Sequence, residues 1–235
     1  MKKELTRRKP FMSQVGGLFF VLPSIITVII FVYGMIVWTF NVSLTNKNSV
    51  GVKTIEYVGF KNYTDLIHDE RFTHSLSNLV KFTVVFMLGT LISGFIMALL
   101  LERGIKGEGF FRSFYLYPMA ISFIAMGTVF NWLLNSARGK EAGGINLALQ
   151  KIGLGFLQND WYVSEKGAMY SMAIPAIWQM SGYVLALFLA GFRGIPDDMR
   201  EAARVDGATE IQIYRHVLFP QLTPTLLTVL IILGH

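Results

Sequence analysis

The chain has 235 residues, of which 53% are hydrophobic, and a net charge of +6 at neutral pH. Its mean hydropathy of +0.49 is high for a soluble domain, and because Lys and Arg lie mostly outside the apolar runs, the positive charge indicates membrane orientation rather than nucleic-acid binding. The sequence contains no cysteine, which excludes disulfides and thiolate metal sites.

The N-terminus is basic and precedes a long apolar run. The first ten residues carry five Lys and Arg side chains, and the apolar run covers residues 15–40. A cleaved signal peptide begins in the same way, but its apolar core is much shorter and ends at a small-residue cleavage site, which is not evident here. We therefore expect residues 1–14 to form a cytoplasmic arm and residues 15–40 to form the first transmembrane helix, a signal anchor.

Four more apolar spans follow along the chain. A run of about 20 residues is long enough to cross a bilayer whose hydrocarbon core is about 30 Å thick. The further spans are predicted at 79–101, 114–134, 168–192 and from about 218 to the end of the sequence. Three of the spans contain a proline: Pro23, Pro118 and Pro175. A proline inside a membrane helix either kinks it for packing or provides a bend in a transport pathway. Small residues at positions 89, 93, 94 and 98 favour close helix packing.

The distribution of charge orients these spans. With the N-terminus inside, segments 1–14, 102–113 and 193–217 are cytoplasmic and carry twelve Lys and Arg residues. The predicted external segments, 41–78 and 135–167, are longer together and carry eight. This difference follows the positive-inside rule and places the 193–217 loop in the cytoplasm.

The spans contain almost no ionisable side chain, although ion-coupled carriers generally need such groups at depth. The sequence also lacks the Gly-x4-Gly-Lys-Ser/Thr loop that cradles nucleotide phosphates, and no nucleophile–base arrangement is visible. A transport role would therefore require a motor in another subunit. The chain is predicted to bind no cofactor or metal of its own and not to be an enzyme.

The polar 193–217 loop lies between two apolar spans and has the local signals of two short helices. Pro196 suits the first position of a helix, and Gly207 suits a left-handed stop. Thr209 and Gln212 have the spacing of a capping box that opens a second helix. The alternative from periodicity alone is an amphipathic helix on the inner membrane surface.

The spacing within this loop matches a known motif. Glu201-Ala202-Ala203 is followed after three residues by Gly207, and after nine more by a Val-Leu-Phe-Pro sequence that ends at Pro220. This resembles the EAA loop of the membrane subunits of binding-protein-dependent ABC importers, where Ile and Leu stand in place of Val and Phe. The resemblance ties six residues to a partner ATPase: Glu201, Ala202, Ala203, Asp206, Gly207 and Pro220.

Three further segments, 58–78, 107–118 and 178–203, resemble the carbohydrate branch of these permeases, the maltose-type membrane subunits. The implied fold is all-α, a polytopic transmembrane helix bundle of the type I ABC importer permease kind. Its core would cover residues 79–235, after a periplasmic segment at 41–78. Such permeases have a further helix, so the chain is expected to be truncated at the C-terminus.

The resemblance implies a permease subunit of an ATP-driven sugar importer in a bacterial or archaeal inner membrane. Its expected partners are a second permease, two ATPase subunits that hold Mg-ATP, a solute-binding protein and membrane lipid. The alternatives are a permease of the same class for a polyol or glycerol phosphate, or a membrane scaffold without a transport role.

Candidate residues of the sugar path lie on and near the span before the loop. In maltose-type subunits this helix lines the substrate cavity, and its Trp and Tyr match Trp178 and Tyr183. Aromatic rings suit the apolar C–H face of a sugar, whereas Gln179 and Asn131 could bond hydroxyl groups. The alternative is that these rings face lipid or the protein core.

Overall fold

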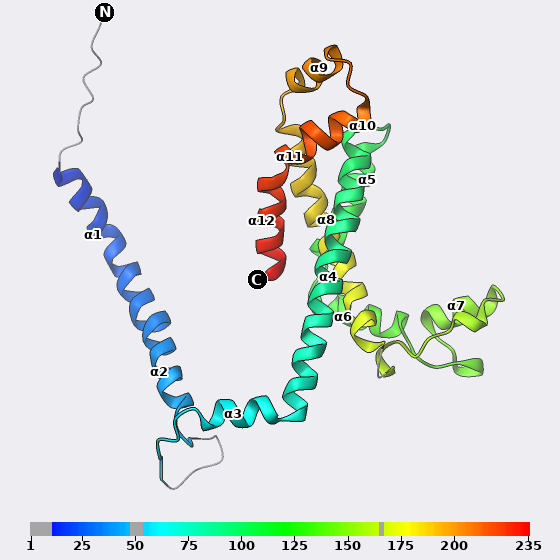
Figure 1. Cartoon of the computed structure of the whole chain (residues 1–235). Coiled ribbons are helices and arrows are strands. Elements are labelled where there is room, and N and C mark those ends of the chain that lie inside the picture. Colours follow the sequence, from blue (N-terminus) through cyan, green and yellow to red (C-terminus); the bar gives the residue numbers. More distant parts are fainter. Residues whose placement is uncertain (1–10, 48–53, 165–166) are drawn as a thin grey trace, which may run out of the picture. The chain divides into compact units, whose positions relative to one another are not determined.

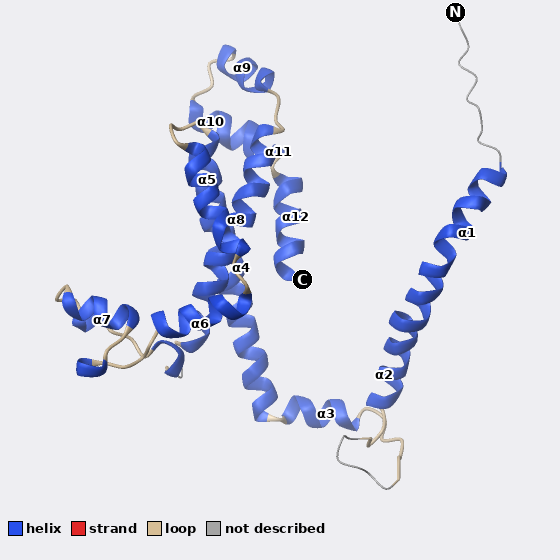
Figure 2. Ribbon diagram, turned by 180° about the vertical axis from the view of Figure 1, so that it is seen from behind, coloured by secondary structure: helices blue, strands red, loops and turns tan. Residues whose placement is uncertain are grey.

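The computed structural model describes residues 11–47, 54–164 and 167–235, with side chains described from residue 20 onward. Over these residues the structure is helical, and the sole β-type pairing there is an isolated bridge between Thr45 and Tyr57 (Figure 2). The predicted all-α fold is confirmed. The chain divides into two compact units, residues 1–74 and 75–235. Most of the predicted arm at 1–14 lies outside the described residues.

The first unit consists of a long apolar helical stretch and a short amphipathic helix. Its elements are α1 (Phe11–Val28), the π-helical turn η1 (Ile29–Gly34), α2 (Met35–Ser43) and α3 (Lys61–His68). The connection between α2 and α3 is closed by the side-chain amide of Asn62, which donates to the carbonyls of Ser43 and Thr45, each at 2.8 Å.

The 75–235 unit is built on two long helices that lie side by side (Figure 1). They are α4 (Glu70–Glu102), which begins in the first unit, and α8 (Ala168–Arg193). Together with the stretch Phe20–Ser43, they are the three described helices long and apolar enough to cross a membrane, or up to five if each of two bent pairs forms one span. The predicted second span is extended at its start, because α4 begins at Glu70.

Small residues let α4 and α8 approach closely, as predicted. A Cβ atom added to Gly94 would lie 2.6 Å from the Cβ of Val184, and one added to Gly89 would lie 2.5 Å from a methyl carbon of Ile177. A side chain at position 94 would require α8 to shift, whereas one at position 89 would require the Ile177 side chain to move. The small-residue pattern on α4 is therefore a packing surface.

The predicted third span, 114–134, is not one continuous helix. It consists instead of α5 (Glu108–Leu116), the 3₁₀ turn η2 (Tyr117–Ala120) and α6 (Phe123–Leu133). The chain bends by 100° between η2 and α6. Pro118 lacks a backbone donor and disfavours continuation of the helix. Ile121 is extended, and the Ser122 side chain then caps α6 by accepting from the Ala125 amide at 3.2 Å.

Helix α8 completes this break from the other side. The Gln179 side chain is buried, and its Nε2 atom donates to the carbonyl of Ile121 at 3.0 Å. The backbone group freed by the break is thereby satisfied, as a membrane environment requires. At Gly182 an added Cβ would lie 2.0 Å from the carbonyl oxygen of Tyr115, so a glycine is needed where α8 crosses α5.

The last apolar span begins earlier than the predicted start near 218, and it is also bent, by 58° between Glu210–Gln221 and Thr223–Gly234. Its first part consists of α10 (Glu210–Ile213) and the π-helical turn η6 (Tyr214–Leu218), which form the end of the 193–217 loop. The helices α11 (Phe219–Gln221) and α12 (Thr223–Gly234) follow. Pro220 and Pro224 flank the bend, and neither can donate to the helical ladder. A proline ring also clashes with the carbonyl four residues earlier, which for Pro220 lies inside η6 and accounts for the widened turn.

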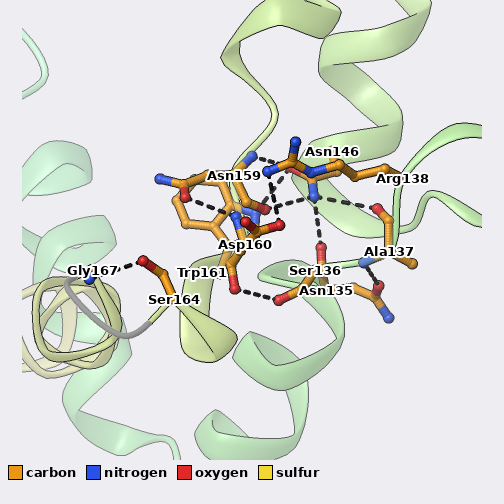
Figure 3. A network of polar contacts seen from close by, with 10 residues as sticks. All are labelled: Asn135, Ser136, Ala137, Arg138, Asn146, Asn159, Asp160, Trp161, Ser164 and Gly167. Carbon is orange, nitrogen blue, oxygen red and sulfur yellow. Dashed lines mark hydrogen bonds and ion pairs between the residues drawn. The ribbon is translucent and has the colours of Figure 1, made fainter.

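A polar segment, residues 134–164, separates α6 from α8 and contains α7 (Gly144–Lys151). Figure 3 shows its organising residue, Asn146, which is fully buried. Its amide nitrogen donates to the carbonyls of Asn135, Ala137 and Asn159 at 3.0, 3.3 and 2.9 Å. Its side-chain oxygen accepts from the backbone N–H of Asn159 at 3.1 Å and from the indole N–H of Trp161 at 3.0 Å. One side chain therefore fixes three parts of this segment.

The apolar core of the 75–235 unit lies where α4, α8, the last helices and the 193–217 loop meet. Phe188 and Phe192 of α8 pack against Phe95 of α4, with ring centroids 5.0 and 6.1 Å apart. The loop contributes Ile213 and Tyr214 to the same cluster. The loop is therefore built onto the core at one end of the bundle.

Candidate functional site

The first helix of the 193–217 loop is α9 (Asp197–Val205). It begins one residue later than predicted, because Pro196 is extended, with φ −60° and ψ 137°, and precedes the helix. Asp197 and Asp198 lie in the first turn, where negative charge complements the helix dipole. Ile195 is buried just before the helix, so α9 starts from a fixed point on the core.

The turn after α9 is closed by two backbone hydrogen bonds around Gly207. The amide of Gly207 donates to the carbonyl of Arg204, and the amide of Ala208 donates to the carbonyl of Ala203, both at 3.0 Å. This is the Schellman pattern, which needs a left-handed residue at its centre. Gly207 has φ +82°, so the predicted glycine stop is confirmed.

The second helix of the loop, α10, opens with the predicted capping box. The Gln212 amide donates to the Thr209 hydroxyl oxygen at 3.4 Å, and the Thr209 amide donates to the Gln212 side chain at 2.8 Å. Two backbone donors at the helix start are thereby satisfied. The loop is a helix–turn–helix unit in which both ends of the turn are fixed.

The apolar side chains of the loop fall into two groups. Ala203 and Ala208 are partly buried against the core, and Ile213 is almost fully buried. Val205 and Ile211 are instead 87% and 80% exposed. The loop therefore presents two large apolar side chains that its own core does not cover.

Five of the six motif residues are exposed. Glu201, Ala202, Asp206 and Gly207 are exposed, Ala203 faces the core, and Pro220 is exposed beside the π-helical turn η6. The structure therefore brings the EAA positions and the glycine turn together at one end of the bundle. That they bind an ATPase stays a prediction.

Charged side chains fasten the loop internally and to the end of α4. The Arg204 Nε atom bonds the Glu210 carboxylate across the turn at 2.9 Å. This hydrogen bond and the charge of Glu210 raise the pKa of Arg204 above its ordinary value. Arg200 pairs with Glu102, the last residue of α4. A hollow of about 590 Å³ lies beside these residues.

The predicted sugar-path residues lie on α8 and α6 but do not form one polar cluster. Trp178 is 40% exposed, and its ring centroid lies 5.4 Å from that of Phe130. Tyr183 is partly buried, and Asn131 is exposed. The Gln179 amide is engaged with the backbone of Ile121. A substrate role for these residues stays a prediction.

Sequence reasoning missed three residues of this region: Val205, Ile211 and Glu102. The first two could have been noted as large apolar side chains within a polar loop. Glu102 carries no such signal, because its partners lie far along the chain. Within residues 11–47, 54–164 and 167–235, no three His, Asp or Glu side chains gather as metal ligands.

Comparisons with known proteins identify the family of this chain. Residues 89–233 match the family model described as binding-protein-dependent transport system inner membrane component. A probable ABC transporter permease of Pyrococcus horikoshii is 36% identical over 227 residues, which cover 97% of this chain and 75% of that protein. A xylose/arabinose import permease of Haloferax volcanii is 32% identical over 222 residues, which cover 94% of this chain and 65% of that protein.

A solved structure shares the fold. It is a bacterial alginate ABC transporter in complex with a periplasmic protein bound to an alginate pentasaccharide, and one of its chains superposes with a TM-score of 0.76 at 20% identity. The superposition covers 96% of this chain and 74% of that one. The fold is therefore that of a type I importer permease, and the chain is a multi-pass membrane protein. It belongs to the family of binding-protein-dependent transport system inner membrane components.

Proposed function

We propose that this chain is the permease subunit of an ATP-driven, binding-protein-dependent sugar importer and receives its driving force through the 193–217 loop. The observation that carries the proposal is the construction of this loop. Its turn is fixed by backbone bonds around Gly207, and it exposes Val205 and Ile211 away from the core. A stiff unit with exposed apolar side chains suits the transfer of movement from a partner protein.

The partner that drives the loop is an ATPase. Because the sequence lacks a phosphate-binding loop, Mg-ATP is held and hydrolysed by two copies of a separate subunit, and this chain is not itself an enzyme. Charge distribution places the N-terminus and the loop in the cytoplasm, where ATP is available. A second permease completes the path, and an external solute-binding protein delivers the substrate.

Sugar is the preferred substrate class. One relative imports xylose and arabinose, and the structural neighbour imports alginate. Trp178, partly exposed on α8, offers an aromatic face to sugar C–H groups. Glycerol phosphate would need cationic side chains at depth, and the spans between residues 15 and 192 contain almost none.

Copurification and uptake test the proposal. The chain, expressed with the other subunits of its importer, should copurify with an ATPase and restore sugar uptake to cells that lack it. Val205→Asp and Ile211→Asp should each reduce copurified ATPase by at least tenfold, because each places a charge on the apolar contact surface. Ile55→Asp, at a side chain of the first unit that is 62% exposed, is the matched control and should have no effect.

Two outcomes separate the alternatives. Normal sugar uptake in cells without this chain would favour a membrane scaffold over a transport subunit. For the substrate, the partner solute-binding protein should be titrated with a panel of sugars, polyols and glycerol phosphate. Tight binding of a polyol or glycerol phosphate alone would replace sugar as the substrate.

A further inference from the structure

Glu102 is the last residue of α4, and its contacts join three elements: α4, α9 and the π-helical turn η6. Its side chain is 6% exposed. One carboxylate oxygen pairs with Arg200 of α9, and the other accepts a hydrogen bond from the Tyr214 hydroxyl at 2.6 Å. Both oxygens are therefore engaged, by partners on opposite sides of the Gly207 turn.

The neighbouring residue strengthens the same junction. The guanidinium of Arg103 lies over the Tyr214 ring, 5.4 Å from its centroid, at a distance typical of cation–π contact. Tyr214 also packs edge-on against Phe192 of α8, with centroids 6.5 Å apart. Tyr214 is thus held by the end of α4 on one side and by the core on the other.

The burial of Glu102 makes this junction hard to break. A carboxylate that is removed from water and then loses its partner is left as an uncompensated buried charge. Helix α9, in contrast, has no fully buried residue of its own, and Ala203 is its one side chain among the described residues that packs against the core cluster. Arg200 therefore provides the polar attachment that sets the orientation of α9 relative to α4.

We propose that Glu102 is a positioning residue that joins α9 to α4, so that α4 moves together with α9 when the loop is driven. The inference rests on the proposed function and adds a polar route for the movement. Without Glu102, displacement of α9 would reach the membrane helices along the chain, through α8 and α10, and through the packing of the small Ala203 side chain on the core. With Glu102, it also reaches α4, whose glycine face packs against α8.

The test compares two arginines that each pair with a carboxylate. Arg200 is 17% exposed, whereas Arg138, which pairs with Asp160 in the 134–164 segment outside the loop, is 50% exposed. The full complex of permeases, ATPase and binding protein is reconstituted with Arg200→Gln, Glu102→Gln or the control Arg138→Gln. Copurified ATPase, the ATPase rate and sugar uptake per ATP hydrolysed are measured for each.

Arg200→Gln and Glu102→Gln should keep copurified ATPase within twofold of wild type and lower uptake per ATP at least tenfold. Arg138→Gln should leave both unchanged. The exchange Glu102→Arg with Arg200→Glu should restore uptake per ATP to within threefold of wild type. A purely structural role would lower the yield of complex but leave uptake per ATP normal in what assembles, and this result would overturn the proposal.

A covalent replacement provides an independent readout. Because these 235 residues contain no cysteine, Glu102→Cys with Arg200→Cys creates the only two thiols among them. Uptake per ATP should fall in the double variant and return when a short bifunctional thiol reagent links the pair. Linked complexes that remain uncoupled would contradict movement of α4 with α9. If the wild-type complex hydrolyses ATP without any uptake, the proposed function fails, and the inference fails with it.

Discussion

Asn146 and Glu102 each organise a polar segment of the 75–235 unit, and they use different chemistry. Asn146 is neutral and bonds mainly to backbone groups of its own segment, residues 134–164 (Figure 3). Glu102 is charged and bonds to side chains of two other elements, through Arg200 and Tyr214. The first arrangement fixes the shape of one segment, whereas the second fixes one element relative to another.

The difference follows from what each group can satisfy. An amide offers donors and acceptors at once, so one buried Asn can close several backbone groups of an irregular segment. A carboxylate only accepts, so it needs cationic or hydroxyl partners, which side chains on other elements supply. We therefore expect loss of Asn146 to disorder the 134–164 segment, and loss of Glu102 to separate intact helices.

The largest effect is expected for Asn146→Ala. It leaves three carbonyls, one amide and the Trp161 indole without their partner, and buried groups left in this state cost about 1–3 kcal/mol each before water replaces some bonds. We expect the free energy of unfolding of this segment to fall by about 2–4 kcal/mol. Backbone hydrogen exchange should become faster in residues 134–164 and not elsewhere. Ser136→Ala, which removes one bond to the carbonyl of Asp160, should have a much smaller effect. Equal exchange in the two variants would contradict the central role of Asn146.

Gly144→Ala should be the next largest. Gly144 has φ +51°, and an added Cβ would lie 2.1 Å from the carbonyl oxygen of Leu133. Strain and overpacking together should destabilise the segment by about 1–3 kcal/mol. Gly153→Ala is the matched control, because Gly153 has φ +80° but nothing within 4 Å of an added Cβ. The thermal unfolding temperature of the purified chain should therefore fall more for Gly144→Ala than for Gly153→Ala. An equal fall in the two variants would show that the positive φ alone, and not the contact with Leu133, causes the effect.

Gly207→Ala isolates the conformational term in the 193–217 loop. Its φ is +82°, and nothing lies within 4 Å of an added Cβ. The substitution should therefore lower the free energy of unfolding by only about 1 kcal/mol. The geometry of the Schellman turn should nevertheless change. Because of this change, we expect less copurified ATPase and lower sugar uptake. Gly207→Asn should retain more of both, since Asn tolerates the left-handed region. Wild-type uptake in Gly207→Ala would show that the geometry of this turn is not needed for coupling.

The parts of this molecule that the sequence predicts are those held by neighbours along the chain. The Gly207 stop and the Thr209–Gln212 capping box each depend on contacts within a few residues. The bond between Tyr214 and Glu102 joins residues 112 positions apart, and no pattern in a single sequence indicates it.

The third span shows the same limit. Pro118 suggests a kink, but length and apolar character suggest one crossing. The 100° bend depends on the Gln179 amide, which reaches the carbonyl of Ile121 from 58 positions away. A full break in a membrane helix requires such a partner, and the partner becomes evident only in the folded chain.

The smallest effect is expected for the Arg204–Glu210 pair, which has the same chemistry as the Glu102 junction but lies in solvent. Both side chains are more than half exposed, and ion pairs of this kind are weak and screened by salt. The bond to Glu210 raises the pKa of Arg204, so its contribution would be lost only as the pH rises through that higher pKa, far above neutrality. Arg204→Gln should therefore leave the thermal unfolding temperature unchanged near neutral pH and at any salt concentration. A salt-dependent loss of stability in this variant, as large as that in Arg200→Gln, would show that burial is not what separates the two arginines.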